Sequence, residues 1–369
     1  MNKSRRNSFV IFVICLIIVL KFDLVIAQFS KWVKEDFKVI NQVVYNQNVD
    51  FENRAEILKL GANYMVLDQS KLKMYDNEGL AIWEKEVSTQ NILMASGKAS
   101  IALVEKKSGD VFIVDLKGNI KASHFGFGGV KGLKYFNEKY VGLLKTDGTL
   151  TILNEKLEIL SNTVLPKGEI IDFSINIERQ DIVAVVLDLS RKDFNTKLVI
   201  ATFNGEITSG SNLFSEIAYQ LWLTEDQIKL ITDSQMMAYD YDCNLEISVP
   251  FDRTVRKFFY DPEQERFYFN VINEEGQIEN PKAQNAIIAI DKSGETLIEF
   301  DASLDEIEGI KIMDNRLMAF NHEKIVFFDE AGKVVDTYVG KDEILDVIIL
   351  DEKHFGVAYI NHMDLYVLK

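Results

Sequence analysis

The sequence predicts an all-β protein: a β-propeller of eight blades, preceded by an N-terminal signal or anchor helix. Two observations lead to this prediction. A group of short strand patterns recurs about every 40 residues, and no segment of the body follows the 3.6-residue period of an amphipathic helix. A repeat of that length built from strands and turns is typical of propeller blades, whereas β-solenoid repeats are usually shorter.

The repeated unit contains three predicted strands. An apolar strand is followed by a short break, a second strand that ends in Asp or Asn, a glycine-containing turn and a third strand; clear copies lie at residues 63–88, 99–124 and 140–165. The second strands measure the repeat, in steps of 39, 39, 50, 38, 49 and 38 residues. Their ends are predicted near Asp76, Asp115, Asn154, Asn204, Asp242, Asp291 and Asp329.

The turn after the second strand has a physical reason for its composition. An Asp or Asn side chain accepts hydrogen bonds from the backbone that follows it, and glycine supplies the positive φ of a tight hairpin. The glycines in this place are Gly79, Gly118, Gly205, Gly294 and Gly332.

The two ends of the repeat array predict a closed ring. The last copy, residues 363–369, stops where its second strand stops. We expect a strand from the N-terminal side, within residues 37–45, to complete the last blade and so remove an exposed sheet edge. Eight second strands predict eight blades; seven is the alternative if one of the long units is miscounted.

The N-terminus has the pattern of an export signal. Residues 1–8 are basic, residues 9–20 form an unbroken apolar run of twelve, and Val25 and Ala27 make an acceptable cleavage site. Residues 1–27 are therefore predicted to be a signal peptide cleaved near Ala27, or a retained membrane anchor, and both alternatives remain open. Residues 28–369 are predicted to be the propeller, located outside the cytoplasmic membrane.

Charge limits the partners of this body. The net charge of the chain is −16, and the first 27 residues contribute +3, so the remainder carries −19. A body this acidic is repelled by phosphate backbones and anionic headgroups. We therefore expect no nucleic-acid partner, and membrane contact only through the N-terminal segment.

One segment carries a family resemblance. Residues 72–83 (LKMYDNEGLAIW) contain a strand that ends in Asp, a glycine turn and a Trp in the outer strand, and they resemble the quinoprotein-like, or WD40-like, propeller repeat. The resemblance covers most of residues 50–369, but only the first unit has this Trp. The family includes eight-bladed propellers of the pyrroloquinoline-quinone type and the non-enzymatic scaffold lipoprotein of the outer-membrane β-barrel assembly machinery. The whole chain is also similar to membrane-anchored propellers of Gram-positive clostridia.

The chemistry that the quinone enzymes of this fold require is missing from the sequence. Those enzymes hold their cofactor with adjacent cysteines and a calcium ion. Here Cys15 lies in the apolar run and Cys243 is alone in the body, and the acidic stretch at residues 240–242 is too short for a calcium loop. We predict no cofactor, and we interpret Cys243 as a structural thiol in a turn.

No other catalytic or metal-binding pattern is present. The four histidines, His124, His322, His354 and His362, have no metal-ligand spacing, although the last two could approach each other across a predicted hairpin. There is no GxSxG motif. The glycine-rich residues 124–133 lack the GK[ST] ending of a phosphate loop and are interpreted as a connection between blades in which two backbones approach closely.

Two units are about ten residues longer than the others, and their extra length is predicted to form loops between the first and second strands, at residues 188–197 and 273–285. Corresponding hairpins emerge on one face of a propeller, so the loops should share a face, two blades apart. They are the candidate binding loops, unless they are neutral insertions. The candidate residues are Arg191, Lys192, Asp193, Phe194, Glu274, Glu275, Gln277 and Glu279.

These observations predict a non-catalytic, extracytoplasmic binding or scaffold propeller with a protein partner at the cell envelope. The alternative is an envelope enzyme, a hydrolase or quinone-type dehydrogenase, whose catalytic residues gather from several blades in the central funnel. Converging acids, a His or a metal in the funnel would favour the enzyme; a face with an apolar patch would favour the scaffold. The sequence identifies neither the partner nor the oligomeric state.

Overall fold

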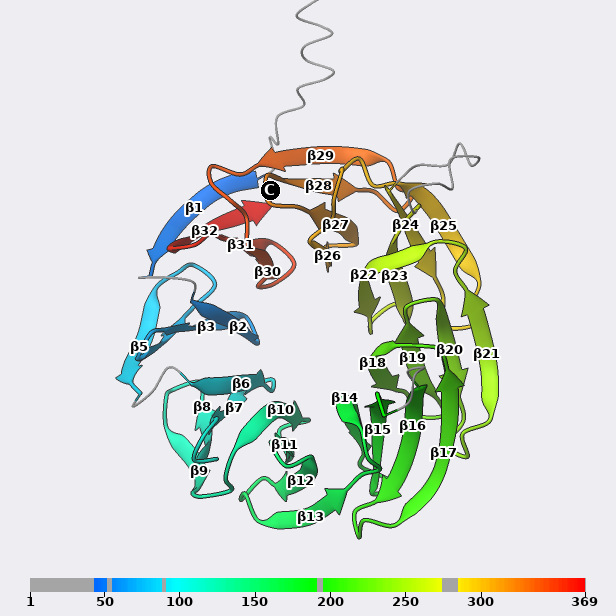
Figure 1. Cartoon of the computed structure of the whole chain (residues 1–369). Helices are drawn as coiled ribbons and strands as arrows, with labels where there is room; N and C mark the ends of the chain where they lie inside the picture. Colours follow the sequence, from blue (N-terminus) through cyan, green and yellow to red (C-terminus); the bar gives the residue numbers. More distant parts are fainter. Residues whose placement is uncertain (1–42, 52–54, 88–90, 191–194, 274–284, 369) are drawn as a thin grey trace, which may run out of the picture.

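A computed structural model describes residues 43–51, 55–87, 91–190, 195–273 and 285–368, which form a ring of eight four-stranded antiparallel sheets (Figure 1). The sheets are the blades, numbered here in chain order. Within each blade the strands are called A, B, C and D from the centre outwards. The predicted eight-bladed propeller is confirmed, the alternative of seven blades is wrong, and the described residues contain no helix.

Seven blades are formed by four consecutive strands. The eighth takes three strands from the C-terminus and one from the N-terminal side. In the order A to D, the strands are β2 (Glu56–Leu60), β3 (Asn63–Asp68), β4 (Lys71–Tyr75) and β5 (Ala81–Glu86) in blade 1; β6 (Ile92–Ser96), β7 (Ser100–Glu105), β8 (Val111–Asp115) and β9 (Ile120–His124) in blade 2; β10 (Val130–Phe136), β11 (Tyr140–Lys145), β12 (Thr149–Asn154) and β13 (Ile159–Val164) in blade 3; β14 (Glu169–Asn176), β15 (Asp181–Asp188), β16 (Asn195–Thr202) and β17 (Ile207–Phe214) in blade 4; β18 (Ala218–Leu223), β19 (Ile228–Thr232), β20 (Gln235–Tyr239) and β21 (Leu245–Pro250) in blade 5; β22 (Thr254–Asp261), β23 (Arg266–Ile272), β24 (Asn285–Ile290) and β25 (Thr296–Asp301) in blade 6; β26 (Gly309–Met313), β27 (Arg316–Phe320), β28 (Lys324–Phe328) and β29 (Val334–Val339) in blade 7; and β30 (Asp346–Ile349), β31 (His354–Ala358), β32 (His362–Leu368) and β1 (Val43–Asp50) in blade 8.

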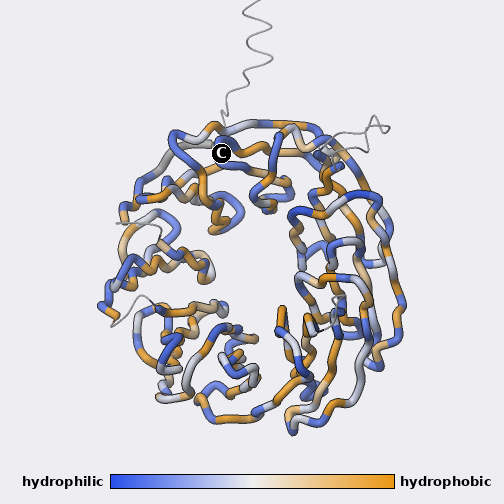
Figure 2. The backbone as a smooth tube through the Cα atoms, in the orientation of Figure 1, coloured by the Kyte–Doolittle hydropathy of each residue, from blue (hydrophilic) through white to orange (hydrophobic). Residues whose placement is uncertain are grey.

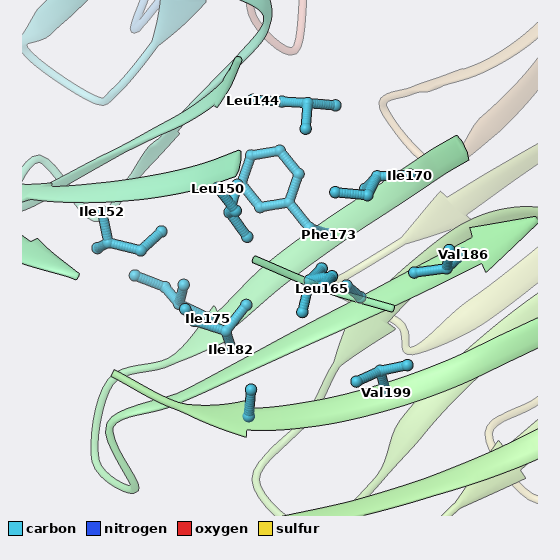
Figure 3. Packing of buried hydrophobic residues seen from close by; sticks show 12 residues of the cluster. Leu144, Leu150, Ile152, Leu165, Ile170, Phe173, Ile175, Ile182, Val186 and Val199 are labelled. Atoms are coloured by element: carbon cyan, nitrogen blue, oxygen red, sulfur yellow. The ribbon is translucent and has the colours of Figure 1, made fainter. Parts of the chain in front are cut away.

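The hydrophobic core lies between the blades. The described residues form eight buried clusters, and each cluster joins two neighbouring blades. In the cluster between blades 3 and 4, Ile152 of β12 packs with Phe173 of β14 and Val186 of β15 (Figure 3). Because both faces of a blade are covered, the B and C strands are almost continuously apolar and buried, and hydrophobic stretches recur in every blade (Figure 2).

The turn between strands C and D has the same geometry in blades 1 to 7. Its first residue accepts hydrogen bonds from the backbone that follows; the carboxylate of Asp115, for example, accepts from the N–H groups of Lys117 and Asn119 at 2.9 and 2.8 Å. The fourth residue has a positive φ, and the strand pair is bulged directly before the turn. This is a type I turn followed by a left-handed residue, in which the left-handed residue matches the twist of the two strands.

The structure corrects two of the predicted turn positions. In blade 4 the second strand was expected to end near Asn204, but the turn begins at Thr202. In blade 5 that strand was expected to end near Asp242, but the turn begins at Asp240. In blade 5 the left-handed position is occupied by Cys243, with φ 63°. The tertiary packing of that side chain between blades 4 and 5 replaces the conformational freedom of glycine.

Each of these turns also packs against the outer strand of the preceding blade. Gly118 lies under the ring of Trp83, whose Nε1 donates to the carbonyl of Leu116 at 2.8 Å. A Cβ at Gly332 would lie 2.3 Å from the ring of Phe300. The glycines therefore serve the backbone conformation and the close approach of two blades at the same time.

The ring is closed by β1, which pairs antiparallel with β32 from Val43 opposite Leu368 to Asp50 opposite His362. The strand expected within residues 37–45 shares only three residues with β1, and residues 37–42 lie outside the described part. Its register is set by the partner strand and by the inter-blade cluster, where Val49 is buried beside Tyr64 of blade 1. The side chain of Gln47 donates to the carbonyl of Gly79 at 3.2 Å, so β1 contacts the next blade's turn as the other D strands do.

The glycine-rich connection from β9 to β10 lies against the β7–β8 hairpin. The N–H of Gly128 donates to the carbonyl of Ser108 at 3.0 Å, and the N–H of Val130 donates to that of Lys106 at 2.8 Å. A Cβ at Gly109 would lie 2.3 Å from the carbonyl oxygen of Gly128. The interpretation of this segment as a close approach of two backbones is confirmed.

We expect Gly109→Ala to destabilise the protein by about 3 kcal/mol, because it combines a left-handed conformation with a clash against backbone that cannot move aside. Gly148 is the matched control: it has a similar φ, +84°, in the corresponding hairpin of blade 3, but no atom within 4 Å of its Cβ position. Gly148→Ala should cost only about 1 kcal/mol. Denaturant unfolding of the two variants measures the difference, and equal costs would show that the Gly109–Gly128 approach is unimportant.

Deletion of residues 43–50 should abolish the cooperative unfolding of the ring. It removes the outer strand of blade 8 and leaves the backbone of β32 as an exposed edge that promotes aggregation. Thermal unfolding followed by circular dichroism, with light scattering to detect aggregates, measures the effect. A deletion variant that stays monomeric and melts like the parent would contradict closure by β1.

Candidate functional site

The antiparallel blades give the ring two different faces. The A–B hairpins and the C–D turns all lie at one end of the sheets, which we call the turn face. The B–C hairpins and the D-to-A connections between blades lie at the other end, which we call the insertion face. This division follows from the strand order, which is the same in all eight sheets.

The predicted binding loops belong to the insertion face, but their bounds need correction. Asp188 and residues 195–197 are paired in β15 and β16, so only residues 189–194 separate these strands. Much of the added length of blade 4 extends its strands, all four of which have eight residues. In blade 6, Asn285 belongs to β24, and residues 273–284 separate β23 from β24.

None of the eight candidate residues can be placed. Residues 191–194 and 274–284, which contain Arg191, Lys192, Asp193, Phe194, Glu274, Glu275, Gln277 and Glu279, lie outside the described residues. Their role in binding stays a prediction. Their flanking strands show that the two segments emerge on the insertion face, two blades apart.

The insertion face carries the most exposed apolar side chains of the described residues. Five large apolar side chains are at least 64% exposed, and all five lie at this end of the blades. They follow or end a D strand, or follow a B strand, and are Phe125, Val164, Leu189, Phe214 and Val339. Large exposed apolar side chains gathered on one face are typical of an interaction surface.

The inner strands of four consecutive blades are bulged at the insertion face. In β10, β14, β18 and β22, one residue near the start of the strand has no partner in strand B, and the residue before it is buried. The registers described for the other four blades contain no such bulge. The unpaired residues are all exposed, and we call them the bulge rim: Lys131, Ile171, Tyr219 and Arg256.

Polar contacts join the blades of this rim. Lys131 pairs with Glu169 of the next blade at 2.5 Å. The buried carboxylate of Asp172 contacts Lys134 at 2.5 Å and accepts from the N–H of Leu221 at 2.9 Å, so it connects blades 3, 4 and 5. These contacts connect the inner strands of blades 3, 4 and 5.

One face of the Tyr219 ring packs against a side chain of the next blade. Its ring stacks on that of Phe258, with a centroid distance of 6.4 Å and an interplanar angle of 16°. Partial burial raises the pKa of its hydroxyl, Asp233 raises it further, and the nearby charge of Arg256 opposes the rise. The side chain is therefore a neutral phenol at physiological pH.

The turn face contains the funnel of the propeller. A hollow of about 1020 Å³ lies among the inner strands of blades 6, 7, 8 and 1. Ile57, Phe259 and Ile312 contribute apolar surface to it, and Lys311 is paired there with Asp346 at 3.6 Å. Lys59 also lines the hollow. Partial burial lowers the pKa of its amine, and the negative charges of Asp351 and Glu263 oppose this decrease.

Asp351, at the edge of the funnel, joins blade 8 to blade 1. Its carboxylate lies 2.9 Å from Nδ1 of His354 and accepts from Nδ2 of Asn77, in the C–D turn of blade 1, at 2.8 Å. Burial alone would raise the pKa of Asp351, but the hydrogen bonds from Asn77, His354 and two backbone N–H groups outweigh it and hold the pKa well below its usual range.

The histidines do not form a site together. His354 lies at the turn-face end of β31, opposite Val367, whereas His362 lies at the insertion-face end of β32, opposite Asp50. The expectation that they could approach each other is wrong, because the strand pair separates them along its length. His124 stacks on Phe127, and His322 is half-exposed beside Glu308.

Two further observations concern metals and membranes. Among the described residues, no group of three or more His, Cys, Asp or Glu side chains could hold a metal ion, and residues 240–242 form a C–D turn. Burial raises the pKa of the Cys243 thiol, as expected for a structural cysteine. Within the same part of the chain, no helix has the length and apolar character needed to cross a membrane. Residues 1–27 lie outside it, so signal peptide or anchor stays a prediction.

Comparison with protein-family models assigns the chain to a family. A model described as a family of unknown function, DUF5711, matches residues 34–366. The chain belongs to this family. No curated protein matches the sequence.

Solved structures show that this member of the family shares its fold with known propellers. BamB from Moraxella catarrhalis is 8% identical, with a TM-score of 0.59 over 88% of this chain and all of that one. The C-terminal WD40 domain of Sif2 is 9% identical, with a TM-score of 0.66 over 89% of this chain and 99% of that one. At these identities the likeness shows the fold alone. It supports the WD40-like part of the resemblance, whereas the quinoprotein-like and clostridial resemblances stay predictions.

We expect Asp351→Asn to lower the free energy of unfolding at pH 7 by about 1 kcal/mol, because it weakens hydrogen bonds that join two blades. An unfolded carboxyl group titrates near pH 4, and the folded pKa is lower. The stabilisation is therefore complete above about pH 5 and is lost as the pH falls through about 4 towards the folded pKa. Parent and variant should converge in acid. Glu352→Gln, at the exposed neighbouring residue, is the control, and a difference that does not change with pH would contradict the role of Asp351.

Proposed function

We propose that this chain is a non-catalytic binding scaffold outside the cytoplasmic membrane, which holds a protein partner at the cell envelope through its insertion face. One observation carries the proposal: the five most exposed large apolar side chains of the described residues lie on that face. A rigid closed ring presents such a surface without a large loss of conformational entropy on binding.

The path of the chain supports the same assignment. β1 begins at the turn face, where Val43 pairs with Leu368, the last residue of β32. The insertion face is the end of the ring opposite the point where the described chain begins.

The enzyme alternative has one observation in its favour among the described residues: six acidic side chains and His354 line the funnel hollow. The funnel hollow combines apolar side chains with charged groups that pair with one another, such as Lys311 with Asp346 and His354 with Asp351. The first pair joins blades 7 and 8, and the second lies within the A–B hairpin of blade 8, so both pairs have a structural role.

Cross-linking in intact cells tests the proposal. Protease added to wall-stripped cells should digest the body, and a cross-linker that does not enter cells should join it to a specific envelope protein. Phe214→Glu and Val164→Glu should each reduce the recovery of that partner at least tenfold, because a buried interface tolerates an unpaired charge poorly.

The control is Ile120→Glu, an equally radical change at a residue that is 57% exposed near the turn face. It should leave recovery within about twofold of the parent, since surface changes outside an interface have small effects. Complete protection from protease, or equal loss of the partner in all three variants, would overturn the proposal.

A further inference from the structure

The bulge rim is a second, independently built feature of the insertion face. A bulge inserts one residue into a strand and redirects its side chain, and such bulges are often found beside functional sites. Here the same insertion occurs in four consecutive inner strands, each time after a buried residue: Val130, Ile170, Ala218 and Val255. The four unpaired residues lie at the insertion-face ends of inner strands, which border part of the ring's centre (Figure 1).

The rim side chains of blades 4, 5 and 6 lie on adjoining strands. β14 packs against β18 along the ring, where Asp172 accepts from the N–H of Leu221. Tyr219 stacks on Phe258 of β22, and the charges of Asp233 and Arg256 both act on its hydroxyl. An aliphatic, an aromatic and a cationic side chain therefore follow one another along the rim.

The charges of the rim favour one kind of occupant. Lys131 is already paired with Glu169, whereas within the described residues no ion pair is recorded for the exposed guanidinium of Arg256. Ile171 and Tyr219 are 37% and 42% exposed, so each presents a partly buried apolar surface. Arginine binds carboxylates with two parallel hydrogen bonds, and Tyr and Arg are enriched at the energetic centres of protein interfaces.

We propose that Ile171, Tyr219 and Arg256 form a binding site for an extended acidic peptide segment of a partner protein. A carboxylate of the peptide pairs with Arg256, and an aromatic or aliphatic side chain packs on Tyr219 and Ile171. The proposal rests on the function proposed above, because it places the partner's contact on the same face. The site places the cationic side chain of Arg256 on a body that is otherwise strongly acidic. An acidic peptide is therefore attracted by the local charge of the site and not by the net charge of the protein.

A random twelve-residue peptide library selected on the full chain tests the site. Selected peptides should be enriched in Asp or Glu together with an aromatic or aliphatic residue. By fluorescence anisotropy, Arg256→Glu and Tyr219→Ala should each weaken a selected peptide at least tenfold. Changing the peptide's acidic residue to Lys should restore binding to Arg256→Glu.

Lys353→Glu, at an exposed residue of the turn face, is the matched charge-reversal control and should leave affinity within about twofold of the parent. Circular dichroism should show that all variants unfold like the parent. The proposed site is contradicted if the library yields no acidic binders, or if the selected peptides bind both rim variants with the affinity of the parent. It is also contradicted if Arg256 supports binding only to vesicles of anionic lipid. Peptide binding at the rim without an envelope partner in cells would support the site and overturn the proposed function. A cellular partner that binds the rim variants as well as the parent would support the proposed function and overturn the site.

Discussion

The pairing of β1 with β32 is the contact on which the rest of the ring depends. Each blade is too thin to hold a core of its own, and its apolar faces are buried only against the two neighbouring blades. A linear array would leave two outer faces uncovered. By joining the N-terminal strand to the last blade, the chain turns eight incomplete cores into a continuous circle, and the cluster between blades 8 and 1 has the same form as the others.

The two faces of the closed ring also differ in how uniform they are from blade to blade. On the turn face, short turns with an Asx residue and a left-handed residue press each blade against the outer strand of the one before, and little variation is compatible with that contact. The described part of the insertion face is less uniform from blade to blade. Its hairpins differ in length, its strand ends expose apolar side chains, and its inner strands carry the bulges. Sequence differences between blades therefore accumulate where a partner can use them.

The parts of this structure that could be predicted from sequence are those determined locally. The strand periods and the Asp-to-glycine turns such as Asp115–Gly118 predict the blades and their number. The turns at Thr202 and Asp240 were misplaced by two residues. In the second of them, Cys243 adopts through packing a conformation that local rules assign to glycine. The bulge rim could not be predicted, because the bulge at Tyr219 depends on the pairing register of two strands rather than on either sequence alone. The extra residues of blade 4 were assigned to a loop although many of them lengthen paired strands.

The direction of β1 has a mechanical consequence. Tension applied to the chain ahead of Val43 enters the ring at the turn-face end of β1 and acts along the strand, parallel to its neighbour β32. In that direction the hydrogen bonds of the ladder are loaded together, in shear, whereas a strand pulled from its edge would lose them one at a time. A load applied between the N-terminal chain and the insertion face would therefore be borne by the strand that closes the ring.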